Sequence, residues 1–137
     1  MAENNFFQRN SDNLYFVFRV LVGLMFIQHG AQKLFGAFGG VGPNGGTVQL
    51  ISLFGLAGII EFFGGLFIVV GFLTRWAAFF GALDMVGAFA IVHIKNGFIP
   101  ILNGGELVVV FFASFLIILV YGARKFGLDK KSSNAKK

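Results

Sequence analysis

Four apolar stretches constrain this chain more than any other feature of its sequence. A helix needs about 20 predominantly apolar residues to cross a bilayer, and four segments approach that requirement. They are residues 14–35, 50–73, 76–94 and 106–121. The segments between them carry glycine, proline and asparagine, which is typical of loops and turns. The pattern predicts an all-α fold in which the spans form an integral membrane four-helix bundle.

The composition also indicates a membrane protein. Hydrophobic residues make up 56% of the 137 residues, phenylalanine occurs twenty times, and only 12% of residues are charged. A soluble domain usually carries about a quarter charged residues. We therefore expect the lipid bilayer to be the main partner of this chain's surface.

The basic residues predict how the spans are oriented. Six of the eleven lie between Arg124 and the C-terminus, and four spans place them on the same side as Arg9 and Arg75. The positive-inside rule then predicts that both termini are cytoplasmic. The predicted organisation is a cytoplasmic segment (1–13), a four-span membrane domain (14–124) and a basic, disordered cytoplasmic tail (125–137).

Two classes of function are excluded at this stage. The net charge of +5 does not indicate nucleic-acid binding, because it is concentrated in a flank next to an apolar segment, where it would meet anionic lipid. The chain has no cysteine. Disulfides, thiolate metal sites and persulfide chemistry are therefore absent from it, and we predict no metal site.

Ionisable residues inside the predicted spans indicate either packing or function. Each costs about 2.5–3.5 kcal/mol near the membrane centre unless it is paired or lines a cavity. On an ideal helix Arg19, His29 and Lys33 fall within an arc of about 80°. This arc predicts one polar stripe on the first span, and we expect it to face the interior of the bundle.

Glu61 and Asp84 lie within the second and third spans among small residues, which let a neighbouring helix approach closely. Depths estimated from the helical rise place Arg19 nearest to Asp84 and Glu61 nearest to His29. The sequence therefore predicts an Arg19–Asp84 pair and a Glu61–His29 pair with Lys33 nearby.

His93 is expected at the outer rim with Lys95 and Glu106. Nine residues separate His93 from Asp84, which is half a turn out of phase on an ideal helix. The two can face one cavity only if the helix ends or unwinds near His93.

These residue types suit quinone chemistry. A quinone needs proton donors at its carbonyl oxygens when it is reduced, and a quinol needs proton acceptors. We assign catalysis to Glu61, His29 and Lys33, and substrate binding to His93, Glu106, Arg19 and Asp84, with the Arg19–Asp84 pair mainly structural. A proton path would use the same residue types.

Haem is disfavoured, because axial ligation would need His29 and His93 on facing surfaces at one depth.

Four segments, in this order and spacing, resemble the DoxX family. They are "HGAQKLFG", "EFFGGLFIVVGFLTRWAA", "ALDMVGAFAIVHIKNGF" and "GGELVVV". The resemblance covers about residues 14–128 and implies a four-helix prokaryotic membrane protein linked to thiosulfate:quinone oxidoreductase systems. The polar positions that the pattern keeps are His29, Lys33, Glu61, Arg75, Asp84, His93 and Glu106.

Three functions follow as hypotheses. The first is a quinone-interacting subunit of an oxidoreductase in the prokaryotic plasma membrane, acting with a redox partner protein. The second is a non-catalytic subunit that anchors or assembles a partner, in which the polar residues only lock the helices together. The third is a small transporter, which would have to form a homo-oligomer because four spans are few.

Overall fold

The computed structural model describes residues 2–129. Within this range its secondary structure is helical, and no β-strand is present. The main helices are α1 (Ala2–Arg9), α2 (Ser11–Phe35), α3 (Leu53–Val70), α4 (Thr74–Ala88), α5 (Pro100–Asn103) and α6 (Glu106–Tyr121). A short 3-10 turn, η1 (Ala37–Gly39), follows α2. The π-helix η2 (Phe89–His93) and the 3-10 turn η3 (Ile94–Asn96) continue α4.

Three of the four predicted spans are confirmed as helices long and apolar enough to cross a membrane: Ser11–Phe35, Leu53–Val70 and Thr74–Asn96. The fourth, α6, has the predicted bounds but only 16 residues, so it is about 24 Å long. A typical hydrocarbon core is about 30 Å thick. A bundle of four complete spans and the cytoplasmic location of both termini therefore stay predictions.

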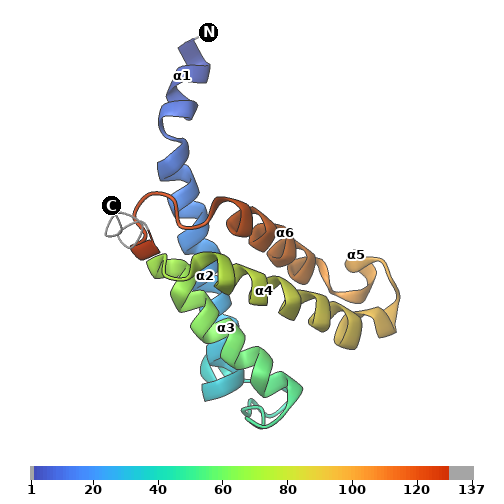
Figure 1. The fold of residues 1–137 in the computed structure, drawn as a ribbon. Helices are drawn as coiled ribbons and strands as arrows, with labels where there is room; N and C mark the ends of the chain where they lie inside the picture. The colour runs from blue at the N-terminus through green and yellow to red at the C-terminus, as the bar shows by residue number, and fades with distance from the viewer. Residues whose placement is uncertain (1, 130–137) are drawn as a thin grey trace.

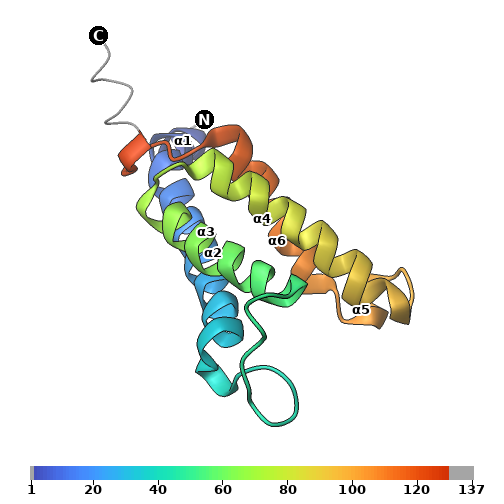
Figure 2. The same cartoon turned by 60° about the horizontal axis from the view of Figure 1, so that its bottom comes forward.

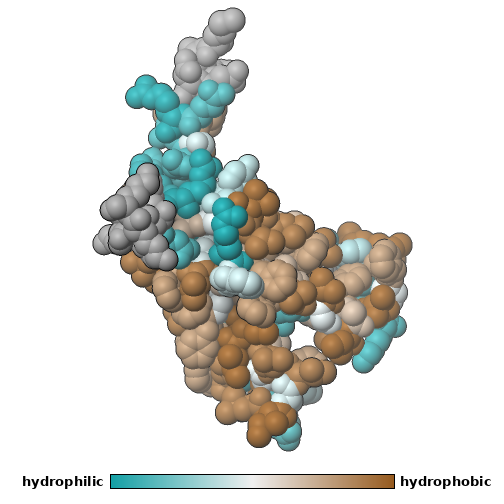
Figure 3. Space-filling model, in the orientation of Figure 1, coloured by the Kyte–Doolittle hydropathy of each residue, from teal (hydrophilic) through white to brown (hydrophobic). Residues whose placement is uncertain are grey.

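The helices pack as two hairpins. Helix α2 packs mainly against α3, which we call the first hairpin, and α4 packs mainly against α6, the second hairpin. Figures 1 and 2 show that the hairpins meet near the turn between α3 and α4 and diverge away from it. The space-filling view shows a hollow between the two hairpins (Figure 3).

Glycines bring the two helices of the first hairpin into close contact. A Cβ atom added to Gly30 would lie 2.4 Å from the backbone nitrogen of Phe62, and one added to Gly65 would lie 2.7 Å from the carbonyl oxygen of Gly23. Real side chains do not approach backbone atoms so closely. The seam between α2 and α3 therefore depends on having no side chain at these positions.

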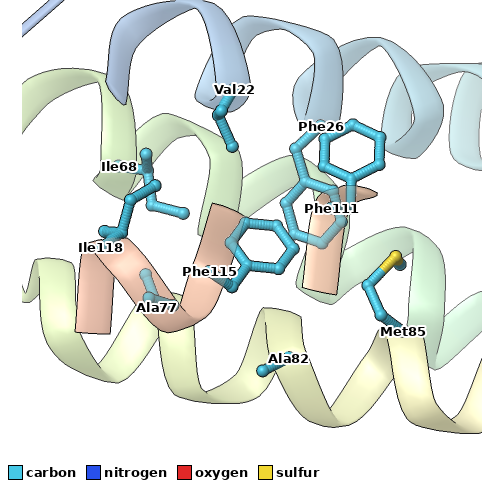
Figure 4. Close-up of a cluster of buried hydrophobic side chains, with 10 residues drawn as sticks. Val22, Phe26, Ile68, Ala77, Ala82, Met85, Phe111, Phe115 and Ile118 are labelled. Carbon is cyan, nitrogen blue, oxygen red and sulfur yellow. The ribbon is translucent and has the colours of Figure 1, made fainter. Parts of the chain in front are cut away.

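The apolar core lies where the hairpins meet. Phe26 of α2, Ile68 of α3, Ala78 of α4 and Phe115 of α6 are at most 1% exposed, and several of these residues appear in the cluster of Figure 4. The rings of Phe26 and Phe115 meet edge to face, with centroids 4.7 Å apart. This core holds the two hairpins together at one end and leaves the other end open.

The segment after α6 returns to the turn between α3 and α4. The carboxylate of Asp129 accepts hydrogen bonds from the backbone N–H groups of Leu73 and Thr74, at 2.7 and 3.0 Å. Residues 125–129, which belong to the predicted tail, therefore contact the helices. The remainder of that predicted tail, 130–137, lies outside the described residues.

Candidate functional site

A cavity of about 570 Å³ lies between the two hairpins, and we call it the central cavity. Both helices of the first hairpin and both of the second contribute to its walls. Most of the lining is apolar, including Phe54, Ile60, Phe80 and Phe111. Five ionisable side chains also line it: His29, Lys33, Glu61, Asp84 and His93.

Lys33 and Glu61 form an ion pair across the first hairpin. The Lys33 Nζ atom donates to both carboxylate oxygens of Glu61, at 2.6 and 2.5 Å. The Glu61 side chain is 5% exposed and that of Lys33 is 19% exposed. The predicted Glu61–His29 pair is wrong, because among the described residues the carboxylate bonds Lys33 and forms no hydrogen bond or ion pair with His29, although the three groups line one cavity.

Asp84 faces the cavity from α4 without a partner for one of its oxygens. Its Oδ2 atom is buried and accepts no hydrogen bond from the described residues. Glu61 and Lys33 line the same cavity from the opposite hairpin. A buried carboxylate oxygen of this kind calls for a hydrogen-bond donor from a ligand or a water molecule.

His29 is half-buried on the same face of α2 as Lys33. Its ring contacts Phe111 of α6 edge to face, with ring centroids 5.7 Å apart. The histidine of the first hairpin therefore contacts the second hairpin across the central cavity.

His93 lines the same cavity as Asp84 because the helix changes its geometry between them. On an ideal α-helix nine residues would place them about 180° apart. The π-helix η2 (Phe89–His93) holds about one extra residue per turn, which turns His93 back by about 100°. The condition stated from the sequence, that the helix must unwind near His93, is met.

Asn103 holds His93 in place, and sequence reasoning missed this residue. The Nδ1 atom of His93 lies 3.1 Å from the carbonyl oxygen of Asn103. Since a carbonyl only accepts, Nδ1 is the donor. The Asn103 side chain in turn bonds Gly97 and Gly105 at 2.7 and 2.8 Å. An asparagine next to a glycine was visible in the sequence, but only as a sign of a turn.

Arg19 lies outside the central cavity, and its predicted pairing with Asp84 is wrong. The side chain is fully buried and donates to the carbonyl oxygens of Ile68, Val69 and Phe126 at 2.5, 3.3 and 3.1 Å. The first two carbonyls end α3, where the helix dipole is negative and favours a cation. Arg19 therefore stabilises the closed end of the molecule and does not bind a ligand in the central cavity.

Glu106 also lies outside the lining of the central cavity. It is exposed at the first turn of α6, where a carboxylate interacts favourably with the helix dipole. Lys95 is likewise exposed. Of the seven predicted site residues, the structure thus brings together five, and it places Arg19 and Glu106 elsewhere.

Among residues 2–129, no group of three or more histidine and carboxylate side chains is arranged to hold a metal ion. The ionisable side chains of the central cavity carry hydrogen-bond donors and acceptors. The apolar walls would hold the rest of an amphipathic molecule.

Comparison with known proteins places the chain in a family. Residues 14–94 match the DoxX family. An uncharacterized protein of Haemophilus influenzae is 36% identical over 120 residues, which are 82% of this chain and 86% of that protein. A Bacillus subtilis protein named "Putative oxidoreductase CatD" is 27% identical over 118 residues, 81% of each chain. No solved structure matches.

The matched region is more than half of the chain and includes all five ionisable residues of the central cavity. The two curated relatives extend the similarity over most of the chain. This chain therefore belongs to the DoxX family of membrane proteins.

Proposed function

We propose that this protein is a membrane subunit of a quinone-linked oxidoreductase system in the prokaryotic plasma membrane, and that the central cavity binds the quinone headgroup. The observation that carries the proposal is the gathering of five ionisable side chains in one largely apolar cavity between two hairpins. The name of the Bacillus subtilis relative supports an association with redox chemistry.

The residues present fit a quinone. The volume of about 570 Å³ lies within the range of small-molecule sites. The buried Oδ2 of Asp84 has no donor among the described residues and could accept one from a quinol hydroxyl. Lys33 and His29 supply N–H groups suited to carbonyl oxygens.

A bound quinone would supply exchange of two electrons and two protons. The chain's own residues would bind the headgroup and hold protons at named atoms. Lys33 Nζ holds one beside the Glu61 carboxylate, and Asp84 Oδ2 is open to receive one. Because the sequence has no cysteine, no thiol can relay electrons, and we assign the electron supply to a partner redox protein.

The first experiment is mass spectrometry of an organic extract from the purified, mildly solubilised protein. We expect near-stoichiometric quinone with the wild type and at least a tenfold loss with Glu61→Gln. Glu106→Gln is the matched control, because it removes the same charge outside the cavity and should retain quinone. The absence of quinone from the folded wild type would contradict the proposal and favour an anchoring role.

A second variant tests the cavity without touching an ionisable group. Gly87 lines the central cavity, and a Cβ atom added to it would meet nothing within 4 Å. Gly87→Leu should therefore leave folding intact while it fills part of the cavity, and should lower quinone retention about as much as Glu61→Gln. Full retention would show that any quinone is bound elsewhere.

The orientation in the membrane can be tested because the chain has no cysteine. Single cysteines at Ser132 and Asn44 would lie in the predicted cytoplasmic tail and in the loop after the first span. A membrane-impermeant maleimide applied to intact cells should label only Asn44→Cys. Labelling of Ser132→Cys under the same conditions would overturn the predicted orientation.

A further inference from the structure

A second cavity, of about 490 Å³, lies at the end of the molecule where the hairpins meet, and we call it the end cavity. The first turn of α4 forms one wall, and the segment that follows α6 forms the other. The lining residues that matter here are Thr74, Arg75, Trp76, Tyr121, Arg124 and Asp129. None of them belongs to the central cavity.

Two guanidinium groups from different parts of the chain are held at this cavity. Arg75 donates to the carbonyl oxygen of Leu119 at 3.0 Å. Arg124 pairs with Asp12 at 2.7 Å, and its guanidinium lies over the rings of Tyr15 and Tyr121, 5.7 and 5.3 Å from their centroids. Each arginine has five N–H groups, so these contacts orient the side chains and leave donors for a ligand.

The charged groups at the end cavity include a cation that an anionic ligand could neutralise. The carboxylate of Asp129 is directed at α4, where it accepts from Leu73 and Thr74. Among the described residues, Arg75 forms no ion pair with a carboxylate. The lining therefore carries two cations and the Asp129 carboxylate. Arg124 is paired with Asp12, so Arg75 is the cation that has no carboxylate partner among the described residues.

Thr74 adds an unpartnered donor. Its side chain is fully buried, and its hydroxyl oxygen forms no hydrogen bond within the described residues. A buried hydroxyl without a partner is costly unless a ligand or water satisfies it. The combination of this hydroxyl with two guanidinium groups, each of which has free N–H donors, matches the oxygens of a phosphate group.

The surroundings of the cavity indicate where such a phosphate comes from. Trp76 and Tyr121 line the cavity and are 62% and 52% exposed, and these residue types gather at the level of lipid headgroups. The neighbouring surfaces of α4 and α6 expose apolar side chains such as Phe80 and Val120. A soluble phosphate would use neither feature, whereas a phospholipid would use both.

We propose that the end cavity binds the phosphate of an anionic phospholipid headgroup through Arg75, Arg124 and the Thr74 hydroxyl, with the acyl chains along α4 and α6. Binding at this site differs from non-specific electrostatic attraction between lipid and the lysines of residues 130–137, because it depends on the geometry of the guanidinium groups. It does not rest on the proposed quinone function.

Native mass spectrometry of the detergent-solubilised protein with added phosphatidylglycerol or phosphatidylcholine tests the proposal. We expect phosphatidylglycerol to bind at least about tenfold more tightly, because the anionic headgroup benefits more from two arginines. Arg75→Gln and Arg124→Gln should each lower phosphatidylglycerol binding about tenfold. Arg75→Lys, which keeps the charge but loses the fork, should lower it about threefold.

Two controls keep the test specific. Replacing Lys130, Lys131, Lys136 and Lys137 together by glutamine should change binding less than about twofold, and so should Lys95→Gln at the other end of the second hairpin. Equal binding of the two lipids, or full binding by the folded Arg75→Gln and Arg75→Lys variants, would overturn the proposal. Displacement of phosphatidylglycerol by millimolar inorganic phosphate would overturn the assignment to a lipid.

Discussion

Helix α2 carries two cations within its apolar length, Arg19 and Lys33, and the fold stabilises them differently. Fourteen residues separate them, or about 21 Å along the helix. Arg19 lies at the closed end, fully buried among backbone carbonyl oxygens. Lys33 lies on the wall of the central cavity and pairs with Glu61.

This difference gives Arg19 a structural role and leaves the charge of Lys33 accessible to a ligand in the central cavity. The partners of Arg19 are backbone atoms of α3 and of the segment after α6, which cannot move without unfolding those elements. The partner of Lys33 is a titratable side chain next to open space. A ligand could therefore replace part of the Lys33–Glu61 pair, whereas nothing could replace the contacts of Arg19.

Arg19→Met should give the largest effect on stability. It leaves the carbonyl oxygens of Ile68, Val69 and Phe126 without their donor, and buried unsatisfied groups cost about 1–3 kcal/mol each. We expect the free energy of unfolding in detergent to fall by about 3–5 kcal/mol. Arg75→Met, at an exposed site with one carbonyl partner, should cost less than about 1 kcal/mol. Equal losses would mean that burial among backbone carbonyl oxygens does not make Arg19 more important for stability than an exposed arginine at the same end.

Glu61→Gln should destabilise the protein less, by about 2–3 kcal/mol, because it leaves the Lys33 cation half-buried without a counter-charge. The double variant Lys33→Met/Glu61→Gln should recover most of that loss, since no unpaired charge is left. Chemical unfolding of the wild type, Glu61→Gln, Lys33→Met and the double variant measures the coupling. Additive losses would mean that the ion pair contributes nothing specific.

Gly30→Ala tests the seam that lies between the two cations. The added Cβ would meet the backbone of Phe62, and forcing α2 and α3 apart should cost about 2 kcal/mol. Gly87→Ala is the matched control, because its Cβ would meet nothing within 4 Å. It should be neutral or stabilise α4 by up to about 1 kcal/mol. Thermal unfolding of the two variants side by side would decide, and similar shifts would contradict the packing at Gly30.

Asp84→Asn should have the smallest effect on stability, a change of less than about 1 kcal/mol in either direction. The carboxylate oxygen that it replaces has no partner in the described residues, so no contact is lost. Ligand retention should nevertheless fall. A large loss of stability with unchanged retention would make Asp84 a structural residue like Arg19.

Much of the site was predictable because the cost of burying charge is a property of residue type. Lys33, Glu61 and Asp84 lie within apolar segments, and any fold that buries those segments must pair these groups or open a cavity beside them. Their partners were less predictable. Helical depth predicted Glu61 near His29, but the long side chain of Lys33 reaches both carboxylate oxygens.

Two local features could not be predicted from the sequence. The π-helix that turns His93 towards the central cavity depends on how α4 continues into η2, and an ideal helical period cannot express it. The contacts of Asn103 join residues 93, 97 and 105 through a loop whose path the sequence does not specify.

The sequence by itself determined the helices, their membrane character and the stripe of ionisable residues on α2, because hydropathy and helical period act locally. The tertiary structure decided that the helices form two diverging hairpins, that Arg19 binds carbonyl oxygens and that five ionisable groups share one cavity. These outcomes depend on which helix faces which, and that choice is made by close contacts between residues distant in the chain, such as Gly30 with Phe62.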